Sequence, residues 1–191
     1  GAVVLRSLFE EEILNKIGTL STGAANVSYG REAEGYVKFY ARQENLDAYL
    51  RLVTEAKKTL SIPVIASINC LNSEEWIPFA KRIESAGADA LEINIFRLPS
   101  DPEEKSESIE KIYIDVARKI RKEISIPVSF KIGYYFSSLG RMINDISNCG
   151  INGIVLFNRF VNFDIDINTM RIEPGNIYSS PSDIALSLRW A

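Results

Sequence analysis

Short apolar runs alternate with longer amphipathic stretches along most of the chain. The short runs are rich in Val and Ile and are bounded by Pro, Gly, Asn or Asp, so they predict strands. They stay apolar through most of their length, which is typical of parallel strands covered by helices. The predicted strands are Ala2–Leu5, Pro63–Ile68, Ala90–Ile95, Pro127–Ile132 and Gly153–Phe157.

The stretches between the strands predict helices because their apolar residues recur with a period near 3.6. One example is the series Ile109, Ile112 and Val116. Gly87 and Gly150 each follow such a stretch, as expected where a helix ends. The predicted helices are Leu46–Leu60, Ser73–Ala86, Ser106–Glu123, Ser137–Asn148 and Ser182–Leu188.

The alternation of strands and helices predicts an α/β fold with parallel strand pairing. We interpret the chain as about five βα units of a TIM (β/α)8 barrel, with a doubly wound sheet as the open alternative. The chain has 191 residues, fewer than the roughly 250 of a closed barrel. Because a strand opens at Ala2 and a helix runs almost to Ala191, we expect a fragment of a barrel.

The polar segment Thr19–Gln43 is long for a loop between a strand and a helix. Long loops of this kind often act as functional lids. Simple packing on the surface is an equally good interpretation.

Composition narrows the functional classes. The net charge of -3 and the pI near 5.2 argue against nucleic acid as a partner, since phosphate binding needs clustered cations. The basic run Arg118–Lys122 lies at a predicted helix end, where the helix dipole favours cations. No apolar run is long enough to span a membrane. The absence of histidine excludes His-based triads and His metal sites, and no metal site is expected.

Two cysteines, Cys70 and Cys149, give no disulfide framework. We therefore expect a reducing compartment, the cytoplasm. Cys70 lies just past a strand end, and an inert thiol is its favoured interpretation.

Strand alternation indicates which side chains face the barrel interior. In a parallel barrel the site lies at the carboxyl ends of the strands. The polar residues expected there are Asn69, Glu92, Asn94, Lys131 and Asn158.

Lys131 stands out because buried lysines are rare unless they are paired or functional. It can bind an anionic ligand, or it can form a pair with Glu92 that merely fills the interior. The asparagines taken singly could be turn formers. Together they can donate and accept hydrogen bonds, which suits a planar heterocycle with imide edges.

Four segments resemble successive strands of dihydroorotate dehydrogenases, and the order and spacing of these segments support the resemblance. Residues 158–166 and Leu188-Arg189-Trp190 are similar to the dihydroorotate dehydrogenase-like branch of that family. The four segments are Pro63–Asn69, Ala86–Asn94, Pro127–Lys131 and Gly153–Phe160.

The resemblance implies an FMN-dependent oxidoreductase that acts on CH–CH bonds in pyrimidine biosynthesis. It implies a dihydropyrimidine-like small-molecule substrate and a possible homodimer. Lys131, Asn94 and Asn69 would contact the flavin, and Asn94, Asn158 and Lys131 the substrate. Residues 1–191 would be a single partial FMN-binding barrel domain that lacks the first strand and the last two strands. The FMN phosphate would then be held beyond Ala191.

One departure from the family concerns the catalytic base. The family places Cys, or Ser on a corresponding loop, where this chain has Arg97. Arginine stays protonated and cannot act as a base. The catalytic base is therefore unknown, and the substrate could be a relative of dihydroorotate.

Two other functions stay open. The chain could be an aldolase-like barrel enzyme in which Lys131 is a Schiff-base nucleophile. It could also be a non-catalytic ligand-binding or structural homologue, since the family base is replaced.

Overall fold

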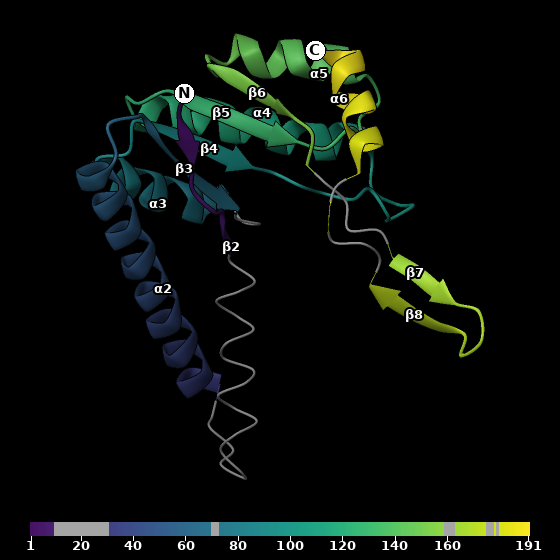
Figure 1. Ribbon diagram of the computed structural model, residues 1–191, viewed down its shortest axis with the longest axis horizontal. Coiled ribbons are helices and arrows are strands. Elements are labelled where there is room, and N and C mark those ends of the chain that lie inside the picture. Colours follow the sequence, from purple (N-terminus) through teal and green to yellow (C-terminus); the bar gives the residue numbers. More distant parts are fainter. Residues whose placement is uncertain (10–30, 70–72, 159–162, 175–177, 179) are drawn as a thin grey trace.

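The structure, a computed structural model, describes residues 1–9, 31–69, 73–158, 163–174, 178 and 180–191. Its main body is one parallel sheet with helices against it (Figure 1). The strands follow one another across the sheet in the order β1-β3-β4-β5-β6, and β2 pairs with β3 beside β1. Their bounds are β1 Val3–Val4, β2 Leu8–Phe9, β3 Val64–Asn69, β4 Ala90–Asn94, β5 Val128–Ile132 and β6 Gly153–Leu156.

Among the described residues, four helices lie between the strands of this sheet, and successive members of these four contact one another. Neighbouring helices that touch in this way form one layer on one side of the sheet (Figure 1). Their bounds are α2 Arg31–Thr59, α3 Ser73–Ser85, α4 Ser106–Glu123 and α5 Leu139–Asn148.

The strand order defines the class of fold. In a doubly wound sheet the order reverses at a switch point, and ligands bind there. In the main sheet every described strand pair is parallel, and the strand positions follow the sequence without reversal. The chain is therefore a parallel half-barrel of βα units, which confirms the predicted α/β class and its TIM-barrel type.

The hydrophobic core lies between the sheet and the helices. Each central strand sends alternate side chains into it, and those of β3, β4 and β5 are fully buried. The helices pack against them with buried residues such as Tyr113, Ala117 and Ile120 of α4. The buried strand residues are Val64, Ala66, Ile68, Leu91, Ile93, Val128, Phe130 and Ile132. The opposite face of the sheet carries the intervening polar residues.

The turns after the helices α3 and α5 use glycine as predicted. Gly87 and Gly150 adopt φ angles of 94° and 86°, a left-handed conformation that residues with a Cβ rarely adopt. Each turn directs the chain into the strand that follows.

Helix boundaries differ from expectation in two places. Residues 31–43 belong to α2, not to a loop, while residues 19–30 of the expected loop lie outside the described residues. Helix α5 begins at Leu139 with Ser138 at its N-cap, because the Ser137 amide and hydroxyl instead donate hydrogen bonds to Glu110 at 2.9 and 2.6 Å.

The expected last helix, Ser182–Leu188, is shifted slightly along the chain. A short 3-10 turn, η1 Pro181–Asp183, precedes α6 Ile184–Trp190. Ser180 and Asp183 exchange hydrogen bonds across the start of η1, so the capping residue is Ser180.

An antiparallel hairpin follows the half-barrel and was not predicted. It pairs β7 Phe163–Asp166 with β8 Arg171–Pro174 and stands away from the sheet (Figure 1). Its apolar residues alternate with charged ones, so that Ile165 faces Ile172 across the pair. The turn holds Met170 at a φ of 53°.

Candidate functional site

Three polar side chains form a row across the carboxyl ends of neighbouring strands. Asn69 of β3 pairs in register with Asn94 of β4, and Asn94 pairs with Lys131 of β5. Residues in register on adjacent strands have their side chains on the same face. The flanking residues of Lys131, Phe130 and Ile132, point into the helix layer and are fully buried. The lysine therefore faces the other way, toward the polar side of the sheet.

Asn94 is an enclosed amide with spare hydrogen-bonding capacity. It is only 4% exposed, and its side-chain oxygen accepts a short hydrogen bond from the Asn158 amide. Asn158 is held in place because its backbone N–H donates to the Ile132 carbonyl at 2.8 Å. Among the described residues, Asn158 is the one side-chain partner of Asn94. Since buried polar groups are rarely left unbonded, the free Nδ2 of Asn94 is suited to a ligand.

A second polar row lies two residues earlier along the same three strands. Ser67, Glu92 and Ser129 are in register on β3, β4 and β5. The Ser67 hydroxyl donates to Glu92 Oε1 at 2.8 Å, and both residues are buried. The two rows are two residues apart along each strand, or roughly 6–7 Å.

Lys131 and Glu92 do not neutralise each other. Both residues are described, and their side chains form no ion pair; Glu92 is bonded to Ser67 instead. The simple interior pair that the sequence left open is therefore not formed. Lys131 is half-buried and keeps its amine available to an anionic group.

Arg97 lies in the loop after β4 and is exposed. Its guanidinium pairs with the Glu104 carboxylate at 2.7 Å, which ties this loop to the approach to α4. This arrangement offers no proton acceptor at the position where the family places its base.

Aromatic side chains gather beside the end of β5. The Tyr134 ring lies 4.4 Å from the Tyr135 ring and 5.7 Å from the Phe157 ring, centroid to centroid. Next to them is a hollow of about 360 Å³ whose lining includes Pro99, Tyr134 and Glu110. Aromatic surfaces of this kind suit planar ligands.

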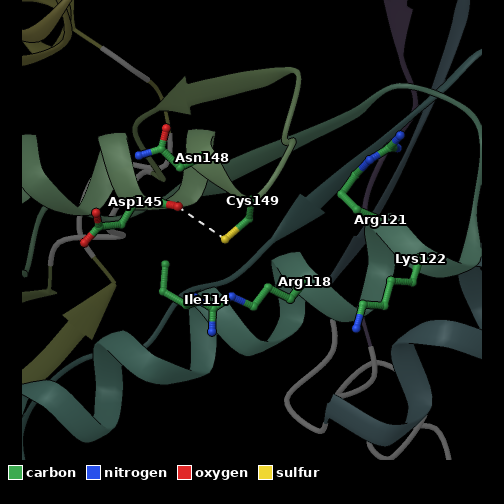
Figure 2. Close-up of a pocket in the computed structure, with 7 residues that line it drawn as sticks. All are labelled: Ile114, Arg118, Arg121, Lys122, Asp145, Asn148 and Cys149. Carbon is green, nitrogen blue, oxygen red and sulfur yellow. Dashed lines mark hydrogen bonds between the residues drawn. The ribbon is translucent and has the colours of Figure 1, made fainter.

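Another cavity is in a different part of the molecule. It measures about 640 Å³ and lies between the last turns of α4 and α5 (Figure 2). Those turns lead into the amino ends of β5 and β6, so the cavity is remote from the polar row. Its lining includes Arg118, Arg121 and Lys122, and the Cys149 thiol donates to the Asp145 carbonyl at 3.3 Å. The cations stand at a helix C-terminus, as the dipole favours.

The structure also bears on membrane crossing, metal binding and Cys70. Within the described residues, no helix combines the length and the apolar composition that a membrane crossing needs. No group of three His, Cys, Asp or Glu side chains in the described part of the chain could hold a metal ion. Cys70, which the sequence left as an inert thiol, lies outside the described residues.

The strand-end position of this polar row, on a parallel half-barrel, is the usual location of active sites in barrel enzymes. Sequence comparison points the same way, although no family model matches the chain. Over 114 residues, 56% of its length, it is 28% identical to the catalytic subunit of dihydroorotate dehydrogenase B (NAD(+)) of Anoxybacillus flavithermus. Over 116 residues, or 58%, it is 25% identical to the subunit of the same name from Bacillus thuringiensis.

The chain is thus related, over part of its length, to dihydroorotate dehydrogenases. The matched region covers 35% and 36% of those two relatives, about a third of their length.

Solved structures give weaker likenesses. A dihydrodipicolinate synthase from Agrobacterium tumefaciens is 19% identical, with a TM-score of 0.46 over 57% of this chain and 36% of the other. The dihydrodipicolinate synthase from Aquifex aeolicus is 15% identical, with a TM-score of 0.42 over 80% of this chain and 52% of the other. At these TM-scores the likenesses carry no argument about function.

Proposed function

We propose that the protein is an FMN-dependent oxidoreductase that oxidises a CH–CH bond in dihydroorotate or a related dihydropyrimidine. The observation that carries this proposal is the row Asn69–Asn94–Lys131 at the carboxyl ends of β3, β4 and β5. Its chemistry, one amine beside several carboxamides, fits the imide edge of an isoalloxazine ring. The partial relation to dihydroorotate dehydrogenases supports the same assignment.

Lys131 is assigned the electrostatic role. A bound flavin would supply the capacity to accept a hydride. The amine of Lys131 would lie beside N1 and O2 of the ring and stabilise the negative charge of the reduced form. Lys131 is half-buried, so its amine is partly shielded from water, which strengthens this interaction.

Asn94 and Asn158 are assigned to the substrate side. The bond between their side chains fixes the Asn94 amide, so that its Nδ2 can donate to a carbonyl of the pyrimidine or of the flavin. Asn69, in register with Asn94, is assigned to the flavin edge. The described residues assigned to the flavin would all contact its ring system.

Flavin affinity tests the role of Lys131. FMN is titrated into the wild-type protein and into Lys131→Ala, following the quenching of flavin fluorescence. We expect the variant to bind at least about tenfold more weakly, which equals about 1.4 kcal/mol. Lys111→Ala is the control, since Lys111 lies on the exposed face of α4 and pairs with Asp115; it should bind FMN as the wild type does. Equal affinity of Lys131→Ala and wild type would remove the assigned role.

The alternatives give different signals. Borohydride trapping of a carbonyl substrate on Lys131, without flavin binding, would assign a Schiff-base enzyme. Binding of both FMN and dihydroorotate without turnover would assign a ligand-binding homologue. A cytoplasmic location and a homodimer stay predictions.

A further inference from the structure

The edge of the sheet contains an irregularity that the sequence does not reveal. Val4 pairs with Ile65 and Leu8 pairs with Ile68. Three edge residues, 5–7, thus stand opposite only two residues of β3, 66 and 67. An extra residue of this kind is a bulge, and bulges re-aim side chains, often next to active sites.

Tyr49 of α2 makes this bulge possible. Pro63, just before β3, and Ile65 in β3 accept hydrogen bonds from the backbone N–H groups of Val3 and Leu5 at the sheet edge. Ser67 is the next residue that faces this side, and there the edge strand is interrupted. The Tyr49 hydroxyl replaces the strand: it accepts from the Ser67 N–H at 2.8 Å and donates to the Ser67 carbonyl at 2.9 Å.

The bulge places Ser7 against Ser67 on the polar face. Their hydroxyl oxygens are 2.6 Å apart. The Ser67 hydroxyl has one proton and donates it to Glu92, so in the Ser7–Ser67 bond the proton must come from Ser7. The lone pairs of the Ser7 oxygen are then free to accept a proton from a third group. Ser7 is half-buried, whereas Ser67 is 0% and Glu92 6% exposed.

We infer that Ser7, Ser67 and Glu92 form a proton relay that serves as the base missing at Arg97; this inference rests on the proposed function. The carbon-bound proton next to the ring carbonyl passes to Ser7 Oγ. At the same time the Ser7 proton passes to Ser67, and the Ser67 proton passes to Glu92. The electron pair of the broken C–H bond stays on the ring as an enolate.

The relay is placed to serve the proposed ligand. The pair Ser67 and Glu92 lies two residues before the pair Asn69 and Asn94 on the same two strands. Glu92 is buried, and its hydrogen bond to Ser67 connects it to the half-buried Ser7.

Exchange of the carbon-bound proton with solvent measures proton removal by the relay separately from hydride transfer to the flavin. Dihydroorotate is incubated in deuterated water with the flavin-loaded protein, kept reduced, and loss of the proton signal next to the carbonyl is followed by NMR. We expect Glu92→Gln, which can still accept the Ser67 bond but takes up no proton, to slow exchange by about 100-fold or more. Ser7→Ala should slow it similarly, and the double variant should lose little more, because the groups act as a unit.

Matched variants separate this role from folding. Ser129→Ala removes a hydroxyl on the other side of Glu92 in the same row and should exchange as the wild type does. Ser7→Thr keeps the hydroxyl and should restore most of the rate. Ser7 is half-buried, so Ser7→Ala keeps the inference testable where Glu92→Gln does not fold.

The outcomes distinguish the two proposals. Wild-type exchange rates in both Ser7→Ala and Glu92→Gln would overturn the relay. The relay would also be overturned if the wild-type protein binds dihydroorotate but does not exchange its proton. That result would leave the proposed function in place. A protein that binds neither FMN nor dihydroorotate would overturn the proposed function and the relay together.

Discussion

At the scale of single residues, Tyr49 shows how one hydroxyl stabilises the sheet edge. Burial raises the pKa of Tyr49 to about 12, so the hydroxyl keeps its proton and can both donate to and accept from Ser67. The two backbone groups it satisfies belong to a fully buried residue.

Tyr49→Phe should therefore destabilise the fold strongly. It leaves the buried Ser67 N–H without a partner and removes one of the bonds to the Ser67 carbonyl. An orphaned buried donor costs about 1–3 kcal/mol, and we expect a loss of that size in urea unfolding. Tyr113→Phe is the comparison: Tyr113 is buried as well, but its hydroxyl does not bridge the two backbone groups of a strand residue as the Tyr49 hydroxyl does. Equal losses in the two variants would contradict the account of the bulge.

Arg97 is the residue at which the chain departs from the family. Arg97→Cys should raise dihydroorotate oxidation if the missing base is what limits this substrate, as steady-state assays of the flavin-loaded protein would show. Arg97→Gln is the control, because it breaks the exposed pair with Glu104 without supplying a base; that pair is worth about 0–1 kcal/mol. No gain in Arg97→Cys would mean either that the relay of Ser7, Ser67 and Glu92 already supplies the base or that the substrate pocket itself differs.

The polar face of the sheet could be predicted from the sequence residue by residue. The period of two along 64–69, 90–94 and 128–132 separates helix-facing from inward-facing side chains, and the structure confirms that separation for these strands. Ser7 could not be found in this way, because its direction depends on a bulge and on a tyrosine from a helix more than forty residues away. The roles of Lys131, Asn69, Asn94 and Asn158 stay predictions.

At the scale of elements, carboxylates fasten helices to the segments that enter the next strand. Glu84, near the end of α3, accepts hydrogen bonds from the Ser125 hydroxyl and amide at 2.7 Å each and from the Ile126 amide at 3.2 Å. The Ser125 hydroxyl, then the backbone amides, hold the pKa of Glu84 below its ordinary value of 4.5. The contact fixes the start of β5, which carries Lys131.

This contact gives a defined pH dependence. A carboxyl whose pKa is lower in the folded than in the unfolded state stabilises the fold above its unfolded pKa. That stabilisation is lost as pH falls from about 4.5 through the lower folded value. In Glu84→Gln, the drop in unfolding free energy between neutral and acidic pH should be smaller than in wild type. Ser125→Ala removes the largest cause of the shift and should lie between the two; identical drops in all three proteins would exclude the contact as a source.

The first half of α2 and the β7–β8 hairpin were not predicted from the sequence, for physical reasons that can be identified. The first half of α2 contains Gly35, which disfavours a helix interior, and its large apolar residues Tyr36, Val37, Phe39 and Tyr40 are bunched together, with no long stripe of helical spacing. The β7–β8 hairpin does alternate apolar and charged residues from Phe163 to Ile167, a signal that could have revealed it. Its turn was hidden because Met170, rather than Gly or Asn, takes the positive φ.

At the scale of the whole molecule, strands that follow one another in sequence order bring side chains from distant segments to one edge. Asn69, Asn94 and Lys131 are separated by 25 and 37 positions in the chain, yet they are neighbours in register. Since the parallel strands end at the same edge, a ligand there meets all three. The proposed flavin binding depends on the position of the Lys131 amine in this row.

The midpoint potential of the bound flavin tests most directly whether the amine of Lys131 lies beside the flavin ring. It is measured by reductive titration in the wild-type protein and in Lys131→Met, which keeps a long side chain and loses the charge. A cation beside N1 and O2 stabilises the anionic reduced ring, so we predict a lower potential in Lys131→Met. Equal potentials in the two proteins would show that the amine of Lys131 does not face the flavin, and would contradict the proposed site.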